Sequence, residues 1–271
     1  METALSYQKS RVLLTAYELG IFTALSNKSK GSKEVAKILK ADVRATDRIM
    51  NALVALELLK KKKSEFSNTN LTGRFLVKGK PYYLAGLMHS VNLWNGWGTL
   101  TEAVRKGRSV LKGGVARFDK NWTKSFIAAM DNRAKAQAPA TARIIGLKGV
   151  SRVLDVGGGS GAYSIEFVKI KSGISAVVFD LPSVIPLTKN YIRKAGFLDR
   201  IKTRAGDYTK DELGSGFDLV YLSAIVHSNS ESENVALIKK SAAALNKSGR
   251  VVVQDFVMDE DRINPPFGAL F

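Results

Sequence analysis

The chain has 271 residues, 45% of them hydrophobic and 24% charged, which is typical of one large or two smaller globular domains. It contains no cysteine, which excludes disulfide bonds, thiolate chemistry and Cys-based metal sites, and without an apolar signal core or membrane-spanning run we expect a cytoplasmic protein. The formal net charge of +18 belongs to the N-terminal half, because residues 1–150 hold 27 Lys and Arg against 10 Asp and Glu, whereas residues 151–271 hold 15 against 14.

Residues 1–90 are expected to form an all-helical N-terminal domain with a small appended hairpin. Thr46 can cap a helix that runs to Leu59, along which Ile49, Leu53 and Leu56 recur at helical spacing. Four lysines, 60–63, follow this helix, and a polar segment rich in turn formers comes next. This order is typical of a winged helix, in which the lysines either contact DNA at the wing or form a solvated helix end.

Residues 91–150 are expected to form a helical connector. One apolar face of a long helix is predicted to carry four side chains, which are Trp122, Phe126, Ile127 and Met130. Pro139 is expected to kink or break this helix. His89 lies between apolar segments, and we interpret it as a structural residue.

From residue 151 the pattern alternates between buried strands and helices. Five short apolar runs predict strands, at residues 152–156, 176–180, 200–204, 217–225 and 250–257. Helical segments separate them, including residues 162–169, 184–195 and 233–245. Such alternation indicates an α/β fold with a doubly wound, mostly parallel Rossmann-like sheet of order 3-2-1-4-5. Ligands of such sheets bind at the carboxyl ends of the strands.

A glycine-rich loop, V-L-D-V-G-G-G-S-G, joins the first of these strands to its helix. Its backbone N–H groups and the helix dipole can receive a ligand, and Gly157, Gly159 and Ala162 fit a variant of the dinucleotide fingerprint. The preceding acid, Asp155, suits a cationic ligand such as a sulfonium better than the pyrophosphate of NAD.

Two further acids follow the next two strands. Asp180 can accept hydrogen bonds from ribose hydroxyls, and Asp207 with Tyr208 can border an adenine ring. Each acid alone is equally consistent with a turn or a helix cap. Acids at three successive strand ends favour S-adenosylmethionine over NAD as the ligand.

These motifs resemble the small-molecule O-methyltransferases that include plant caffeate and bacterial polyketide and hydroxyindole enzymes. The resemblance lies in D-V-G-G-G-S-G, V-F-D-L-P-S-V, A-G-D-Y, L-S-A-I-V-H-S and V-V-V-Q-D-F, and it extends to A-Y-E-L-G-I-F-T-A-L and N-A-L-V-A-L-E-L-L in the N-terminal domain. It implies that residues 1–90 form a winged-helix dimerisation domain, residues 91–150 contribute to a substrate pocket, and residues 151–271 bind S-adenosylmethionine.

The resemblance also assigns roles at the site. Gly157, Gly159 and Gly161 are implied to form the loop at the methionine end of the cofactor, with Asp180 on the ribose and Asp207 and Tyr208 beside the adenine.

Two further residues are implied to carry the chemistry. His227 follows the fourth strand at the ligand-bearing edge, and it matches the family's catalytic base; Asp255 matches the acid that orients this base. Ser223 stands where plant members carry a lysine, and we include it among the cofactor-binding residues. Ser228 follows the base where the family often has an acid.

The expected activity is methyl transfer to a hydroxyl of a small aromatic or polyketide-like molecule, by a homodimer. Family members continue beyond N-P-P-F-G-A-L-F into further strands, so the expected sheet has five strands instead of seven and is incomplete at one edge. Three alternatives stay open: a nucleic-acid-binding winged-helix protein or RNA methyltransferase, a catalytically inactive dimer, and, least favoured, a nicotinamide oxidoreductase.

Overall fold

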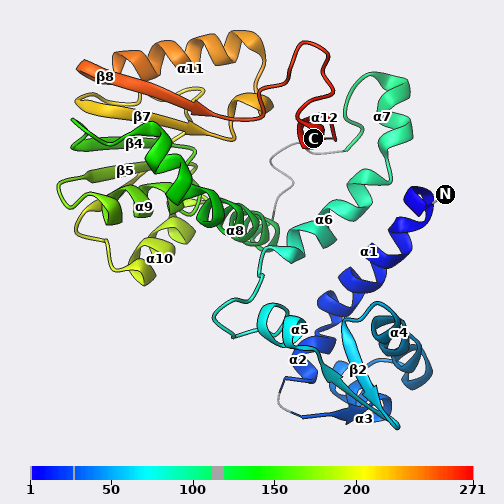
Figure 1. The fold of residues 1–271 in the computed structure, drawn as a ribbon. Helices are drawn as coiled ribbons and strands as arrows, with labels where there is room; N and C mark the ends of the chain where they lie inside the picture. Colours follow the sequence, from blue (N-terminus) through cyan, green and yellow to red (C-terminus); the bar gives the residue numbers. More distant parts are fainter. Residues whose placement is uncertain (1, 27, 112–118, 271) are drawn as a thin grey trace. The chain divides into compact units, whose positions relative to one another are not determined.

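A computed structural model of the chain describes residues 2–26, 28–111 and 119–270 (Figure 1). The chain divides into two compact units, Met1–Ala129 and Met130–Phe271, and the boundary falls within the long helix α8, Lys120–Ile145. The three-part division expected from the sequence stays a prediction. No helix in the described ranges combines the length and the apolar character that crossing a bilayer requires.

The N-terminal unit consists of helices and a small antiparallel sheet. Its helices are α1 (Glu2–Leu19), α2 (Ile21–Ala24), α3 (Ser32–Leu39), α4 (Val43–Ala55), α5 (Asn70–Phe75), α6 (Leu87–Trp97) and α7 (Leu100–Lys106). The strands β1 (Lys30–Gly31), β2 (Leu59–Lys62) and β3 (Glu65–Asn68) form a sheet in the order β1-β3-β2. The expected hairpin is therefore present, but the domain is not all-helical. Phe22, Met50, Leu53 and Phe66 are fully buried in its core.

Two local expectations for this unit are wrong. The cap of α4 is Asp42, whose side chain accepts a hydrogen bond from the Ala45 amide, and Thr46 lies one turn inside the helix. The lysines do not end a helix, because Lys60, Lys61 and Lys62 lie in β2. Lys61 donates to Asn51 at 2.7 Å and lies over the Phe66 ring, so its ammonium group is engaged within the unit.

Helix α8 continues through Pro139, so of the two expected effects the break is wrong and the kink stays a prediction. An interior proline costs a helix roughly 3 kcal/mol. Ala138 and Ala142 on either side are 1% and 3% exposed in the core of the C-terminal unit, and this packing offsets the cost. Near the other end of α8, Trp122 packs against the edge of His89, which agrees with a structural role for that histidine.

The C-terminal unit is a parallel sheet covered by helices on both faces. It contains β4 (Arg152–Val156), α9 (Ala162–Ile170), β5 (Ser175–Asp180), α10 (Ile185–Ala195), β6 (Ile201–Ala205), β7 (Phe217–Ser223), α11 (Glu231–Ala243), β8 (Leu245–Gln254) and α12 (Pro266–Leu270). The strand order β6-β5-β4-β7-β8 confirms the predicted 3-2-1-4-5 order.

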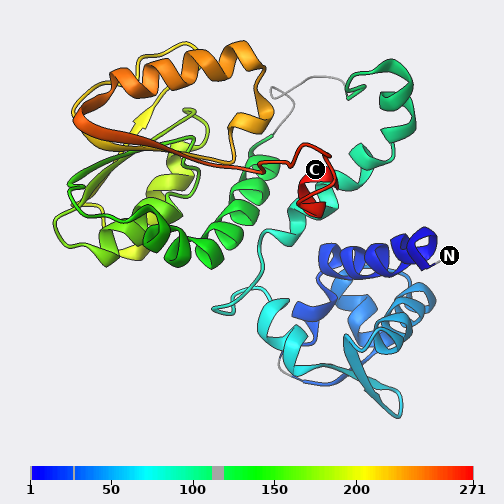
Figure 2. The ribbon, with the colours of Figure 1, turned by 45° about the horizontal axis from the view of Figure 1, so that its top comes forward.

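Two apolar layers explain why this sheet forms. Helices α8, α9 and α10 pack on one face around Val153, Val178 and Leu219, and α11 packs on the other around Leu154 and Val220. In Figure 2 the orange α11 lies on one side of the sheet and the green helices on the other. Because the central strands are buried on both faces, most of their residues are apolar, and the buried Asp155 of β4 is an exception.

The last strand differs from its expected bounds. β8 begins at Leu245 and ends at Gln254, so Asp255 follows the strand instead of lying within it. Residues 246–249 resemble a turn in sequence, yet they continue the strand through an irregularity where Phe217 pairs with Leu245 and Leu219 pairs with Arg250. The effect is to place Asp255 just beyond the carboxyl edge of the sheet.

Candidate active site

The glycine loop of residues 157–161 joins β4 to α9 at the carboxyl edge of the sheet. Gly157, Gly159 and Gly161 have φ angles of 64°, 57° and 73°, a region that side chains rarely adopt. The Gly157 amide donates to the carbonyl of Phe179 at 2.8 Å, which fastens the loop to β5. A Cβ atom at Gly157 would lie 3.0 Å from Ile225 Cγ2, so the loop packs closely against the segment that follows β7.

Asp155 lies beneath this loop and is 1% exposed. Its carboxylate accepts a hydrogen bond of 2.7 Å from the hydroxyl of Ser164 on α9, and a Cβ at Gly158 would meet it at 2.6 Å. Burial raises the pKa of Asp155 to about 7, although the bond from Ser164 opposes the rise. The sequence predicts that Asp155 lies directly against a cationic ligand, whereas the structure places it in the layer between the sheet and α9. A role of Asp155 in cofactor binding stays a prediction. From this position the carboxylate would act indirectly, by supporting the glycine loop.

Asp180 ends β5 and holds the glycine loop from the side. Its carboxylate accepts hydrogen bonds from the amides of Gly159 and Leu181, both at 2.7 Å. Burial raises the pKa of Asp180, and these two amide bonds oppose that rise. Each carboxylate oxygen has a second lone pair, so the group retains capacity for two ribose hydroxyls.

Asp207 and Tyr208 lie in the turn after β6. Asp207 accepts bonds from the amide and the hydroxyl of Thr209, at 3.0 and 2.6 Å, and these bonds lower its pKa. The acid thus has a turn-stabilising role whether or not it meets an adenine ring. The Tyr208 hydroxyl donates to Asn229 at 3.0 Å, which connects this turn to the segment that follows β7.

His227 and Asp255 meet just beyond β7 and β8. His227 lies in a 3-10 turn, Val226–Ser228. Its Nδ1 lies 2.8 Å from Oδ1 and 3.1 Å from Oδ2 of Asp255, and its backbone amide donates to the same carboxylate at 3.3 Å. The imidazole side chain is 27% exposed and the carboxylate 4%. A carboxylate at Nδ1 favours the tautomer with the proton there, so Nε2 becomes the basic nitrogen.

Several residues that shape the site carry no signal in a single sequence. Thr188, fully buried in α10, donates to the carbonyl of Gly159 at 2.6 Å and so fixes the loop from a third side. Ser223, a predicted cofactor residue, ends β7 half-buried and pairs in register with Gln254. Ser164 and Thr188 have short hydroxyl side chains and lie within amphipathic helices. In the sequence they look like ordinary core residues.

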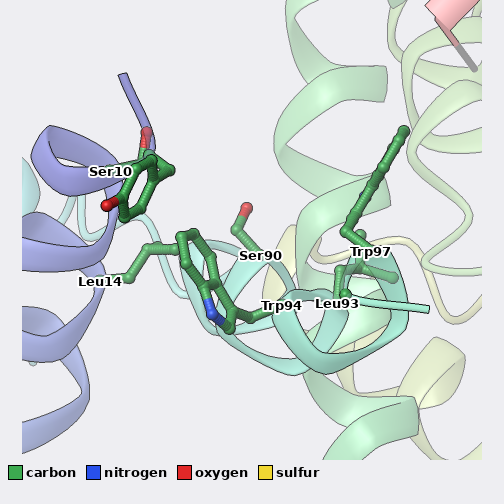
Figure 3. Close-up of a pocket in the computed structure, with 8 residues that line it drawn as sticks. Ser10, Leu14, Ser90, Leu93, Trp94 and Trp97 are labelled. Atoms are coloured by element: carbon green, nitrogen blue, oxygen red, sulfur yellow. The ribbon is translucent and has the colours of Figure 1, made fainter. Parts of the chain in front are cut away.

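A cavity of about 560 Å³ lies in the N-terminal unit, between α1 and α6 (Figure 3). Its lining is mainly aromatic and apolar and consists of Tyr7, Ser10, Leu14, Ser90, Leu93, Trp94, Trp97 and Gly98. These lining residues include no carboxylate, imidazole or ammonium group. This cavity therefore offers an apolar contact surface instead of acid–base chemistry.

Comparisons with known proteins agree with this geometry. A sequence profile of the O-methyltransferase domain matches residues 97–269, and one of the O-methyltransferase dimerisation domain matches residues 1–78. The chain is 34% identical over 268 residues to 3-hydroxy-5-methyl-1-naphthoate 3-O-methyltransferase of Streptomyces sahachiroi, covering 97% of this chain and 78% of the relative. It is 27% identical to the tetracenomycin polyketide synthesis 8-O-methyl transferase TcmO of Streptomyces glaucescens, over 97% and 79% of the two chains.

A solved structure gives the same answer for the fold. Human N-acetylserotonin methyltransferase in complex with S-adenosylmethionine superposes with a TM-score of 0.85 at 25% identity, over 98% of this chain and 81% of that one. Together with the two profiles and the relative at 34% identity, this shows that the chain belongs to the S-adenosylmethionine-dependent O-methyltransferase family.

Proposed function

We propose that this protein methylates a hydroxyl group of a small aromatic or polyketide-like molecule, with His227 as the general base. The observation that carries the proposal is the contact of 2.8 Å between His227 and Asp255 at the edge of the sheet where the glycine loop lies. The relatives named for a naphthoate and for tetracenomycin support the class of acceptor.

The residues present fit S-adenosylmethionine. The loop glycines have positive φ angles and carry no side chains that would shield their backbone, and Asp180 retains lone pairs for hydroxyl groups. When bound, this cofactor supplies an electrophilic methyl group on a positively charged sulfur. We assign the loop glycines to its amino-acid end, Asp180 to its ribose, and Asp207 with Tyr208 to its adenine.

The side chains of the protein supply deprotonation and orientation. His227 Nε2 accepts the proton of the acceptor hydroxyl as the oxygen becomes nucleophilic. Asp255 holds the imidazole through Nδ1 and stabilises the imidazolium that results, because the carboxylate is 4% exposed and poorly screened by water. The departing thioether is neutral, so no acid is needed on that side. The remaining acceleration comes from holding the two reactants in line.

We further propose that the N-terminal unit forms a homodimer. The match of residues 1–78 to a dimerisation domain supports this, as do exposed apolar side chains on α1 such as Leu5 and Tyr7, at 51% and 55%. The comparisons lend no support to the nucleic-acid alternative, and the engaged Lys61 in the wing agrees with them.

Isothermal titration with S-adenosylmethionine and S-adenosylhomocysteine tests the cofactor, and we expect both to bind. His227→Ala should then lower kcat for hydroxyl methylation by about a hundredfold or more, because general bases contribute at least that much. Cofactor affinity should change by less than about twofold, since the imidazole acts on the acceptor side.

Ser228→Ala is the matched control at the adjacent position. It removes a bond of 2.8 Å to the Ile225 carbonyl and leaves both contacts of His227 in place, so kcat should stay close to wild type. Absence of binding by either cofactor would refute the proposal. Full activity of His227→Ala would instead show that catalysis rests on proximity without a base.

A further inference from the structure

The peptide group between Val226 and His227 is hydrogen-bonded on both sides. Its N–H group donates to the Asp255 carboxylate at 3.3 Å, and its carbonyl oxygen accepts from the side-chain amide of Asn234 at 2.8 Å. Asn234 is half-buried and lies in the first turn of α11. Because a peptide group is planar, a bond at each end fixes the orientation of its plane, and with it the direction in which the imidazole extends.

The local chain does not stabilise this conformation by itself. The 3-10 turn Val226–Ser228 is three residues long, and Ala224 just before it has a φ angle of 53°, which residues with a side chain rarely adopt. Such a backbone angle persists only where the surrounding structure enforces it. Support from α11 therefore contributes to the position of His227.

Asn234 is itself connected to the turn after β6 through Asn229. The Tyr208 hydroxyl donates to Oδ1 of Asn229 at 3.0 Å, and Nδ2 of Asn229 donates to Oδ1 of Asn234 at 3.0 Å. Since the Val226 carbonyl can only accept, Asn234 must direct its Nδ2 toward it, and this fixes the direction of every bond in the series. The three side chains are half-buried, which shields the bonds in part from water. We call this series of bonds the asparagine relay.

The turn that carries Tyr208 is attached to the same helix. Lys240 of α11 donates to the backbone carbonyl oxygens of Tyr208, Thr209 and Asp211, at 3.1, 3.3 and 3.1 Å. These bonds use all three donors of the ammonium group. The turn after β6 and the turn that carries His227 are therefore both fixed to α11, and the asparagine relay joins them directly.

We propose that Asn229 and Asn234 are positioning residues for methyl transfer, which align His227 through the peptide group that precedes it. This inference rests on the proposed function, because it takes His227 as the base. The two asparagines take no part in the proton transfer. Without them the imidazole can leave Asp255, and a neutral imidazole without that contact populates both tautomers. The turn assigned to the adenine ring thus also sets the orientation of the base.

The tautomer of His227 measures this alignment without any acceptor. Two-bond proton–nitrogen correlation spectra of the ligand-free protein, at a pH where the imidazole is neutral, show which ring nitrogen carries the proton. The chain has two histidines, and the signal that is missing from His227→Ala belongs to His227. We expect wild type to keep the proton on Nδ1, because the Asp255 carboxylate lies 2.8 Å from that atom.

Two single variants break the asparagine relay, and a third spares it. Asn234→Asp still accepts from Asn229 but cannot donate to Val226, and Tyr208→Phe removes only the hydroxyl. Val235→Asp is the matched control, because it adds the same charge at the next position, where the side chain is 49% exposed. We expect a mixture of tautomers in the first two variants and the wild-type tautomer in the control.

Initial rates with saturating S-adenosylmethionine and 1,3-dihydroxynaphthalene as the acceptor probe give a second measurement. Asn234→Asp and Tyr208→Phe should each lower kcat by about threefold to tenfold, the effect of one hydrogen bond. The calorimetric Kd of S-adenosylhomocysteine should change by less than about twofold, since the Tyr208 ring is retained. The double variant should be no slower than the slower single variant, because both changes break one connected series, whereas independent effects would multiply.

A wild-type tautomer in both relay variants would overturn the inference, even if kcat or stability falls, since the asparagines would then not act through His227. Single effects on kcat that multiply in the double variant would overturn it as well. In either case an active wild type leaves the proposed function intact. Mixed tautomers in the relay variants of a protein that does not methylate the probe would support the inference and count against the proposed function. If Asn234→Asp does not fold, Tyr208→Phe decides the question.

Discussion

Asp155 combines complete burial with an ionisable group under the glycine loop. Its carboxyl pKa is raised to about 7, chiefly by burial, against about 3.9 in an unfolded chain. Between these values the folded protein holds a proton that the unfolded chain has released. The free energy of unfolding contributed by this group therefore falls as the pH rises from about 4 to about 7, and the loss persists above pH 7.

Replacing Asp155 by Asn should remove this pH dependence. The amide keeps the shape of the side chain and can still accept from Ser164, but it carries no charge to bury. We expect Asp155→Asn to exceed wild type in stability above pH 7 by on the order of a few kcal/mol, since one pKa unit corresponds to about 1.4 kcal/mol. The difference should shrink as the pH falls toward 5. Urea unfolding of the ligand-free protein at several pH values measures it.

Asp218 provides a control of opposite sign. Its pKa is lowered by the bond from Asn246 and by the amides of Ser151 and Arg152, so it stabilises the fold above its unfolded pKa and loses that contribution as the pH falls. Asp218→Asn should therefore be less stable than wild type at neutral pH. If the stability of both variants relative to wild type changed with pH in the same direction, burial would not be the main cause of the pKa shift of Asp155.

At the scale of elements, side-chain hydrogen bonds join α8 to the ends of β7 and β8. Gln254 accepts from the hydroxyls of Tyr221 and Thr141, and its amide donates to Gln137 at 3.3 Å. Gln137 also accepts from Tyr163 of α9 at 3.2 Å. Gln254 immediately precedes Asp255, so these bonds hold the strand end from which the carboxylate extends.

Gln254→Leu should destabilise the protein by about 1–3 kcal/mol, because the buried Tyr221 hydroxyl loses its acceptor. The kcat for methyl transfer should fall as well, since Asp255 loses part of its support. Thermal unfolding and initial rates measure the two effects. Val253→Ala is the control, as Val253 is 45% exposed and should cost less than about 0.5 kcal/mol. Similar melting temperatures for Gln254→Leu and Val253→Ala would mean that the hydrogen bonds of Gln254 contribute little to stability.

The elements themselves could be predicted where one pattern dominates. Central strands such as Arg152–Val156 are buried on both faces, so an apolar run bounded by turn residues identifies them. The path of β8 through residues 246–249 could not be predicted, because pairing with β7 overrides their turn composition. The break predicted at Pro139 is wrong for the same reason, since packing against the sheet decides whether α8 continues.

The candidate site could be predicted only in part. Parallel sheets bind ligands at their carboxyl edge, and on this rule the sequence predicts site residues at strand ends; the structure places Asp180, Asp207 and His227 at that edge. Partners distant in sequence stayed hidden: Gln137 and Gln254 are 117 positions apart, and nothing in one sequence indicates that they meet. The contacts of Arg133 with Phe256 and Phe267 could not be predicted either, because these rings come from the far end of the chain.

For the whole molecule, the separation of charge distinguishes the two units. Residues 1–129 hold 23 Lys and Arg against 9 Asp and Glu and so carry +14 of the net charge of +18, and a strongly basic surface repels another copy of itself. A homodimer through this part of the chain therefore has to rely on apolar contact. Exposed apolar side chains lie on two sides of α1: Leu5 and Leu19 share one face, and Tyr7 lies on the opposite side, where it borders the cavity shown in Figure 3.

Light scattering on the eluting protein should accordingly give twice the chain mass of 29.5 kDa. The double variant Leu5→Asp with Tyr7→Asp places two carboxylates in the proposed interface, where desolvation without partners opposes association. We expect it to elute as a folded monomer. Leu198→Asp is the matched control, because Leu198 is 43% exposed in the C-terminal unit, and it should remain dimeric. A double variant that stays dimeric would exclude both Leu5 and Tyr7 from the interface.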